Sequence, residues 1–163
     1  MSIAYINIGS NMGNRNALIE QAITHIEFLC GSRCKQSPVI ESEPWGFESP
    51  HPFLNIGISI ECNLDPLVLL QELLKIEKSI SNTSHRDENG NYIDRLIDID
   101  LIAVDDIVID SPTLQLPHPR MHLRDFVLSP MMHLNSSWVH PIFNQSITEL
   151  YNQLHEKDNK PMG

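Results

Sequence analysis

The 163-residue chain contains little cysteine, few aromatic residues and few basic residues, and it has no long hydrophobic run. Its three cysteines, Cys30, Cys34 and Cys62, are too scattered for a disulfide framework or a closed zinc site. We therefore expect free thiols and a cytoplasmic location. No stretch reaches the roughly eighteen apolar residues of a membrane span, and the first eight residues do not resemble a secretion signal. These absences predict a protein with no membrane partner.

Basic residues are scarce and unevenly placed. The chain has 11 Lys and Arg residues against 21 Asp and Glu residues, which gives a formal net charge of −10. Such a balance argues against nucleic acid as a partner, because phosphate contacts need a basic face. Four of the 11 basic residues nevertheless fall in one stretch without lysine: Arg86, Arg95, Arg120 and Arg124. Arginine suits bidentate recognition of phosphate or carboxylate, so this stretch predicts a small anionic ligand.

The pattern of apolar residues predicts a single domain over residues 1–163, with a frayed tail at 157–163. Strands are expected at residues 2–8, 33–41, 53–62, 95–104 and 107–109, and helices at 14–29, 65–80, 124–133 and 146–154. Pro38 favours a sheet edge or a bulge for the second strand. In the second helix the residues expected to face the core are Leu67, Leu70, Leu74 and Ile80. The order β-α-β-β-α-β predicts an α+β, ferredoxin-like sandwich with additional elements at its C-terminal end.

The stretch RLIDIDLIAV, residues 95–104, places two carboxylates in an otherwise apolar strand. Asp98 and Asp100 point to one face of the strand, about 6.6 Å apart along the chain. The opposite face is apolar: Ile97, Ile99 and Leu101. A merely solvated face is one interpretation of the pair. The other is a Mg²⁺ site in which water and substrate phosphates supply the remaining ligands, and this interpretation also accounts for the arginines.

Four motifs in order resemble one known family. They are A-Y-I-N-I-G-S-N at 4–11, E-P-W-G at 43–46 followed by F-L-N at 53–55, R-x-x-D-x-D at 95–100, and L-P-H-P-R-M-H-x-R-x-F at 116–126. Together they are similar to the 6-hydroxymethyl-7,8-dihydropterin pyrophosphokinases of folate biosynthesis. The resemblance runs from residue 4 to about residue 155. It implies Mg²⁺-dependent transfer of pyrophosphate from ATP to the hydroxymethyl group of the pterin, with release of AMP.

The resemblance also implies roles for residues of the nucleotide site. Asp98 and Asp100 would hold two Mg²⁺ ions, and Arg95 would grip phosphate during transfer, although a surface ion pair is its structural alternative. The positions implied for ATP binding are Glu77, Tyr92, His118 and Arg124. The loop before the aspartates departs from the family, with Ser81-Asn82 in place of a Gly-Arg pair. Arg86 is therefore the candidate for a substitute catalytic arginine.

A pterin is a flat ring with a guanidine-like edge, so its pocket needs aromatic faces and a hydrogen-bonding group. The residues implied for this pocket are Ser42, Glu43, Pro44, Trp45, Phe53, Asn55 and Phe126. Phe53 and Asn55 share one face of their strand, which brings a ring and an amide together. Plain core packing is the alternative for Phe53.

Two other functions fit part of the sequence. A different Mg²⁺-dependent phosphotransferase would use the aspartates and arginines but would not explain Trp45, Asn55 and Phe126. A non-catalytic ligand-binding module would explain the order of elements but not the D-x-D motif with its arginines. For the pyrophosphokinase function the expected partners are small molecules, ATP and 6-hydroxymethyl-7,8-dihydropterin, and we expect a monomer.

Overall fold

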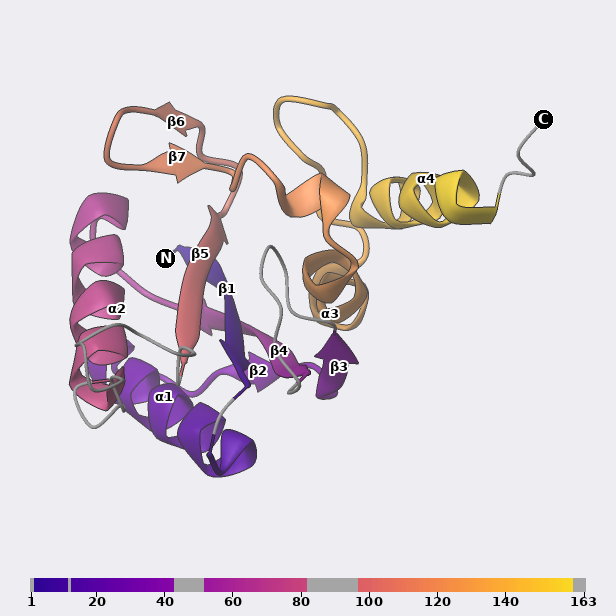
Figure 1. Cartoon of the computed structure of the whole chain (residues 1–163). Helices are drawn as coiled ribbons and strands as arrows, with labels where there is room; N and C mark the ends of the chain where they lie inside the picture. The colour runs from indigo at the N-terminus through magenta and orange to yellow at the C-terminus, as the bar shows by residue number, and fades with distance from the viewer. Residues whose placement is uncertain (1, 12, 43–51, 82–96, 160–163) are drawn as a thin grey trace.

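The computed structural model describes residues 2–11, 13–42, 52–81 and 97–159, and Figure 1 shows how the elements are arranged. The strands are β1 (Ile3–Ser10), β2 (Lys35–Gln36), β3 (Ile40–Ser42), β4 (Phe53–Glu61), β5 (Asp98–Val104), β6 (Ile109–Asp110) and β7 (Gln115–Leu116). The helices are α1 (Arg15–Cys30), α2 (Pro66–Ser81), α3 (Asp125–Asn135) and α4 (Ile147–Asn159), with a short 3₁₀ helix at Met121–Leu123. No helix among the described residues is long and apolar enough to cross a membrane.

The main sheet is antiparallel and has the order β2-β4-β1-β5, with β3 also pairing with β4. The elements from β1 to β5 follow the predicted β-α-β-β-α-β order, except that two short strands, β2 and β3, stand where one was expected. The single strand expected at 33–41 is wrong, because β2 and β3 are separate strands on either side of residues 37–39. Pro38 lies in this break, where it cannot donate a hydrogen bond to the sheet. Among the residues that the structure describes, both strands pair with β4 alone, which agrees with the expected edge position.

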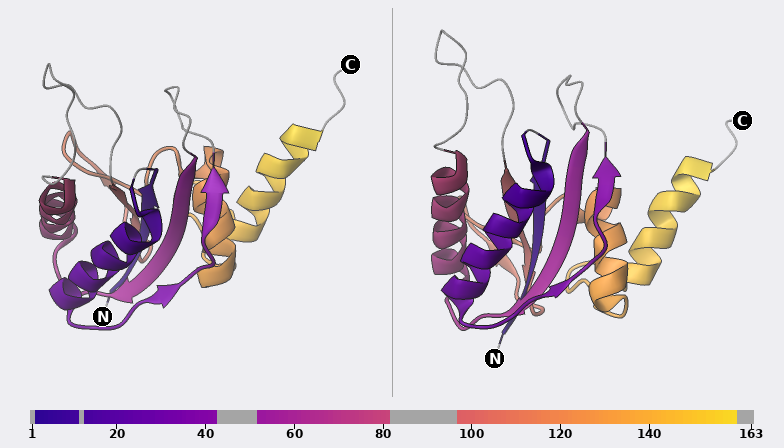
Figure 2. Two further views of the ribbon diagram at one scale, coloured as in Figure 1. Left: turned by 60° about the horizontal axis from the view of Figure 1, so that its bottom comes forward. Right: turned by 90° about the horizontal axis from the view of Figure 1, so that it is seen from below.

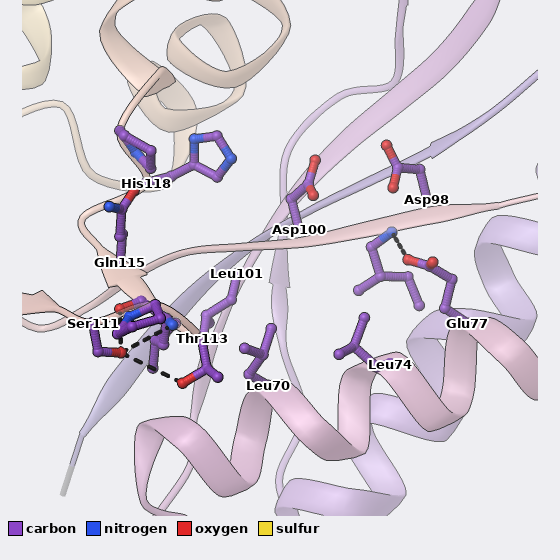
Figure 3. A pocket seen from close by; sticks show the side chains of 14 residues that line it. Leu70, Leu74, Glu77, Asp98, Asp100, Leu101, Ser111, Thr113, Gln115 and His118 are labelled. Atoms are coloured by element: carbon purple, nitrogen blue, oxygen red, sulfur yellow. Dashed lines mark hydrogen bonds between the residues drawn. The ribbon is translucent and has the colours of Figure 1, made fainter.

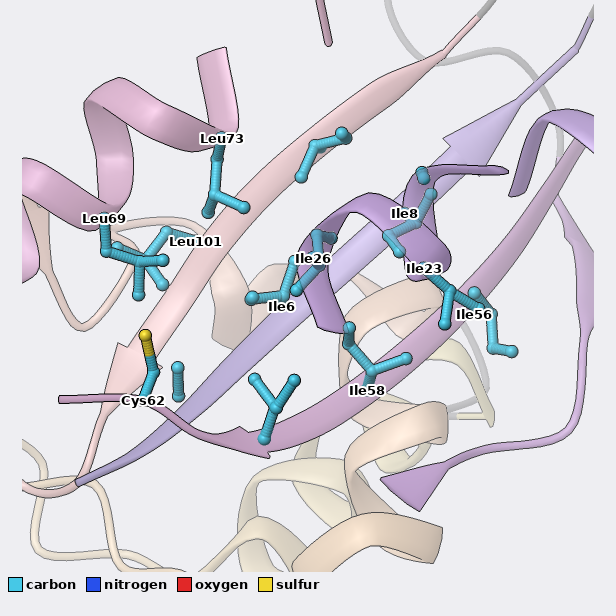
Figure 4. Packing of buried hydrophobic residues seen from close by; sticks show 14 of the residues in the cluster. Ile6, Ile8, Ile23, Ile26, Ile56, Ile58, Cys62, Leu69, Leu73 and Leu101 are labelled. Carbon is cyan, nitrogen blue, oxygen red and sulfur yellow. The ribbon is translucent and has the colours of Figure 1, made fainter. Parts of the chain in front are cut away.

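Helices cover both faces of the sheet, so the molecule has three layers (Figure 2). Helices α1 and α2 lie on one face, and α3 lies on the other with α4 packed beside it. The core under α1 and α2 is built from alternate residues of the central strands, chiefly Ile6, Ile8, Ile56, Ile58 and Leu101 (Figure 4). A second core joins Tyr5 and Ile102 to α3 and α4. The strands therefore bury apolar residues on both faces, as a middle layer must.

Local sequence signals set the helix ends. Helix α1 stops at Gly31, which adopts the left-handed conformation with a φ of 71°. Asp65 begins α2 by accepting a hydrogen bond from the backbone of Leu67. Ser146 and Glu149 form the predicted capping box of α4, in which each backbone N–H donates to the other's side chain at 3.1 Å.

The predicted core face of α2 is partly wrong. Leu67 and Leu74 are 38% and 49% exposed, although they were expected to face the core. The buried residues of this helix are Leu69, Leu73 and Ile80. Apolar residues surround more of α2 than the core requires, so periodicity alone did not set the orientation of the helix. Leu70 and Leu74 instead line a cavity beside β5.

Two further expectations about boundaries are wrong. The strand expected at 107–109 lies at Ile109–Asp110 and pairs with Gln115–Leu116, a strand that the sequence did not predict. The helix expected to end at residue 154 continues as α4 to Asn159. Helix α4 packs against α3, and His155 Nε2 lies 2.7 Å from Asp125 Oδ1 across this contact.

Candidate active site

Polar and small residues gather on the face of the sheet that carries α3, beyond the second core. Strand pairing places Asn55 of β4, Gly9 of β1 and Asp98 of β5 side by side in one row. The next row contains Gly57, Asn7 and Asp100. Because alternate residues share a face, both aspartates and both asparagines point to the same side of the sheet. One end of this face therefore carries a carboxylate pair close to two amides.

The aspartate pair borders a cavity of about 460 Å³ between β5, α2 and the segment around β6 and β7. Asp98 and Asp100 are half-buried, while Ile97, Ile99 and Leu101 are buried on the opposite face, as predicted. Figure 3 shows both carboxylates pointing to the side of β5 away from α2. Glu77, at the C-terminal end of α2, and His118 line the same cavity. The structure thus brings four predicted site residues together.

His118 is held in place by its backbone and its ring. Its N–H donates to the carbonyl of Ile102 at 2.7 Å, and its Nδ1 accepts the backbone N–H of Arg120 at 3.1 Å. Burial lowers the pKa of His118 to about 4, and the positive charges of Arg124 and Arg120 add to this effect. The ring is therefore neutral near pH 7, with its proton on Nε2. A neutral donor at this position suits a phosphate or sugar oxygen.

Arg124 and Phe126 connect the position predicted for the nucleotide with the position predicted for the pterin. Arg124 caps α3, and the carbon of its guanidinium group lies 5.4 Å from the centre of the Phe126 ring. The carbonyl of Phe126 accepts a hydrogen bond of 2.8 Å from the side chain of Asn7. Since Asn7 pairs with Asp100, this bond ties the start of α3 to the strands that carry the aspartates. Phe126 therefore stands next to the polar face.

Phe53 and Asn55 lie on β4, outside the cavity but on the face of the sheet that carries the aspartates. Asn55 is buried, with 4% of its surface exposed, whereas Phe53 is half-buried. Across the strands, Gly9 lies between Asn55 and Asp98, because it pairs with both. A Cβ atom at Gly9 would lie 2.8 Å from Asn55 Oδ1 and 3.3 Å from Phe53. Glycine is therefore required for the Asn55 amide and the Phe53 ring to occupy their places.

Several predicted site residues lie outside the described residues. They are Glu43, Pro44, Trp45, Arg86, Tyr92 and Arg95. Of the other pterin-site candidates, Ser42 ends β3, where its backbone pairs with Phe53. The roles expected for the six residues outside the described ranges stay predictions from the sequence.

Sequence reasoning missed two kinds of site residue. Asn7 and Gly9 were assigned only to a motif, although a buried asparagine in the apolar first strand is itself a signal of a polar role. The wall of the cavity formed by Ser111, Thr113 and Gln115 was also missed. These three polar residues belong to a short turn and strand with no distinctive pattern, so no feature of the sequence marks them.

The carboxylate pair fits a hard divalent cation. Mg²⁺ in phosphate-transfer sites is held by one or two carboxylates, with water and phosphate oxygens completing its octahedron. Asp98 and Asp100 are neighbours on one face and stand at the rim of an open cavity. Within the described ranges, no three His, Cys, Asp or Glu side chains are grouped to hold a metal. The donor set is therefore the two-carboxylate kind that leaves coordination positions to substrate, and a structural zinc site does not fit it.

Comparison with known proteins agrees with this geometry. The family model of 7,8-dihydro-6-hydroxymethylpterin-pyrophosphokinase matches residues 5–136. A protein of Porphyromonas gingivalis named 2-amino-4-hydroxy-6-hydroxymethyldihydropteridine pyrophosphokinase is 39% identical over 142 residues, which cover 86% of this chain and 95% of the relative. A protein of the same name from Aquifex aeolicus is 35% identical over 149 residues, covering 91% and 90% of the two chains.

A solved structure shares the fold at low sequence identity. The Plasmodium falciparum HPPK-DHPS protein superimposes with a TM-score of 0.71 at 15% identity. The match covers 98% of this chain but 44% of the Plasmodium chain, so the present chain spans less than half of that protein. The family model matches most of this chain, and the chain in turn covers 95% and 90% of the two relatives. The chain therefore belongs to the 7,8-dihydro-6-hydroxymethylpterin-pyrophosphokinase family.

Proposed function

We propose that the chain transfers the pyrophosphoryl group of ATP to the hydroxymethyl oxygen of 6-hydroxymethyl-7,8-dihydropterin and releases AMP. The observation that carries the proposal is the row Asn55, Gly9, Asp98. Two strand spacings separate its ends, about 10 Å, which leaves room for a bicyclic ring over Gly9. Asn55 would bind the ring edge, and the hydroxymethyl arm would point toward the aspartates.

The aromatic residues around this row suit a flat ring. Phe53 lies beside Asn55 on the same strand face, and Phe126 is fixed to β1 through Asn7. Stacking between such rings supplies affinity, while the amide supplies orientation. Ser42, Glu43, Pro44 and Trp45 complete the proposed pterin pocket from the sequence.

The nucleotide would occupy the cavity between α2 and the turn before β7. Its wall combines apolar side chains, Leu70 and Leu74, with polar ones, Thr113 and Gln115, as a nucleoside requires. At the rim of the cavity, His118 would donate its Nε2 proton to an oxygen of the nucleotide. Arg124, which lies near both His118 and Phe126, would neutralise phosphate charge between the two substrates. Tyr92 is proposed for the nucleotide from the sequence alone.

Asp98 and Asp100 would hold the two proposed Mg²⁺ ions. Bound there, the metal would neutralise charge on the phosphate oxygens of ATP. Arg95, three residues before Asp98, would stabilise the transferring group, and Arg86 would act as a second catalytic arginine. These roles rest on the family motif, since neither arginine belongs to the described residues.

The proposal includes a single domain over residues 1–163 that acts as a monomer. The observed strand order and connections support a ferredoxin-like description of its core.

The proposed reaction is tested by incubating the protein with ATP, Mg²⁺ and the hydroxymethyl-dihydropterin and separating the nucleotides by chromatography. We expect AMP, formed only in the presence of the pterin. Formation of ADP would instead identify an ordinary kinase, and absence of any turnover would favour a binding module.

A further inference from the structure

Glu77 makes a contact that its expected role in nucleotide binding does not explain. Its Oε2 accepts a hydrogen bond of 2.9 Å from the backbone N–H of Ile99, which lies between Asp98 and Asp100. Figure 3 shows Glu77 reaching β5 from α2, while the aspartates point to the other side of the strand. A side chain of the helix is therefore bonded to the backbone at the centre of the D-x-D motif.

The position of β5 in the sheet explains why this contact matters. Within the described part of the chain, β5 is an edge strand that pairs with β1 on one side, so alternate N–H groups point away from the sheet. Such a group needs a partner when it is buried. A carboxylate acceptor makes a charge-assisted bond, which is shorter and stronger than a neutral one. Glu77 thereby fixes the strand at Ile99. Because successive side chains of a strand point to opposite faces, the side chains of Asp98 and Asp100 then point to the face opposite that of Ile99.

A direct role for Glu77 in holding the metal does not fit the geometry. Glu77, Asp98 and Asp100 line one cavity, but they form no three-ligand group among the residues that the structure describes. The Glu77 carboxylate approaches the strand edge rather than the face that carries the aspartates. The contact that ties Glu77 to the D-x-D motif is its hydrogen bond from the backbone of Ile99, which acts on the orientation of the strand.

We propose that Glu77 is a positioning residue, which sets the orientation of Asp98 and Asp100 by accepting the hydrogen bond from Ile99. The inference rests on the proposed function, because it assigns the aspartates to Mg²⁺ and ATP. Its contact also joins the last turn of α2 to the start of β5, on either side of residues 82–96. Orientation of the carboxylates is thus coupled to the helix that lines the nucleotide cavity.

Two substitutions of Glu77 separate the effect of its side-chain length from the effect of its charge. Glu77→Gln keeps an acceptor oxygen at the same reach but removes the charge, whereas Glu77→Asp keeps the charge and withdraws it by about 1.5 Å, one carbon–carbon bond. Glu72→Gln and Glu72→Asp are matched controls on the same helix, since Glu72 pairs with Lys75 at the surface. They report any change that comes from helix propensity alone.

The first measurement is amide hydrogen exchange at Ile99 in the protein without metal or nucleotide. We expect Glu77→Asp to accelerate exchange about tenfold, the effect of losing one hydrogen bond, and Glu77→Gln, which keeps a weaker neutral acceptor, to accelerate it less. The second measurement is calorimetric binding of the α,β-methylene analogue of ATP in the presence of Mg²⁺. Its affinity should fall about tenfold in Glu77→Asp and by a smaller factor in Glu77→Gln, with both Glu72 variants unchanged.

The reverse order, with Glu77→Gln weaker than Glu77→Asp in analogue binding, would overturn the proposal in favour of a role for the charge. Unchanged analogue affinity in a Glu77→Asp variant that exchanges faster at Ile99 would reduce the contact to a structural one. Failure of the wild type to form AMP would refute the proposed function, and exchange at Ile99 and analogue binding would still decide the role of Glu77.

Discussion

The two faces of the central sheet differ sharply, although the same three strands build both. On the face under α1 and α2, the alternate residues of β1, β4 and β5 are almost all isoleucine or leucine and are 7% exposed or less. On the opposite face, beyond the packing of α3, the rows carry asparagine, glycine and aspartate instead. The first face contributes apolar burial, the main favourable term in folding. The second gives up apolar burial at the positions proposed to bind ligands, and function is expected where such local rules of folding are broken.

The largest effect expected from the difference between the two faces of the sheet is at the two aspartates. Asp98→Asn or Asp100→Asn should lower kcat/KM by about a thousandfold, because metal-held charge neutralisation is worth several kcal/mol. The same change should leave the melting temperature unchanged or higher, since it removes repulsion between like charges. Steady-state AMP formation and scanning calorimetry measure the two effects. Activity near wild type in both variants at low Mg²⁺ would contradict the assigned role.

A substitution on the apolar face should have the opposite profile. Ile58 is fully buried, so Ile58→Ala should lower the free energy of unfolding by about 3 kcal/mol through lost burial and a cavity. At a temperature where the variant remains folded, its kcat should stay within about threefold of wild type, a loss under 1 kcal/mol. Urea denaturation and AMP formation test this pair of values, with Ile58→Val as the milder control. A large loss of kcat in a folded Ile58→Ala would mean that the two faces are not separable.

The pterin end of the polar face can be separated from the nucleotide end. Asn55→Ala removes the amide, and Gly9→Ala places a Cβ atom 2.8 Å from Asn55 Oδ1 and displaces it. Either change should weaken pterin binding about tenfold, the value of one or two hydrogen bonds, and leave binding of an ATP analogue nearly unchanged. Fluorescence titration with the pterin and calorimetry with the analogue give the two affinities. Equal loss for both ligands would place Asn55 in the core rather than in a pterin pocket.

The smallest expected effect is that of pH on His118. Because its pKa in the folded protein is about 4, below its ordinary value near 6.5, the neutral ring stabilises the fold fully above pH 6.5. That contribution is lost as the pH falls from 6.5 toward 4, where the unfolded chain binds the proton more readily. His118→Gln should therefore lose stability less steeply over this window. Some loss should persist, since burial also lowers the pKa of His140.

An NMR titration of the His118 ring gives its pKa directly. A midpoint near 6.5 would show that burial and the two arginines do not act on this ring as the geometry indicates.

Sequence patterns predicted the elements with strong signals. The alternation in β5 and the caps at Asp65 and Ser146 were confirmed, because each depends on residues only a few positions apart. The orientation of α2 could not be obtained in this way. Leucines and isoleucines surround that helix, and a cavity, which belongs to the tertiary structure, occupies part of its apolar side.

For the site, the motif identified Asp98, Asp100 and His118, which the structure brings to one cavity. The contact between Glu77 and Ile99 joins residues 22 positions apart, and the bond between Asn7 and Phe126 joins residues 119 positions apart. Such contacts depend on how the strands and helices pack, and no local pattern encodes them. The role of Gly9 likewise becomes visible only when β4 lies beside it.

We propose that the polar face of the sheet carries pyrophosphoryl transfer, and ³¹P NMR of the reaction mixture measures both products of that reaction. With wild-type protein, ATP, Mg²⁺ and the hydroxymethyl-dihydropterin, we predict equal amounts of AMP and of a pterin diphosphate that contains the former β and γ phosphorus atoms of ATP. Folded Asp100→Asn should form neither product in the same time. Accumulation of ADP with a pterin monophosphate, or equal rates for wild type and Asp100→Asn, would contradict the claim.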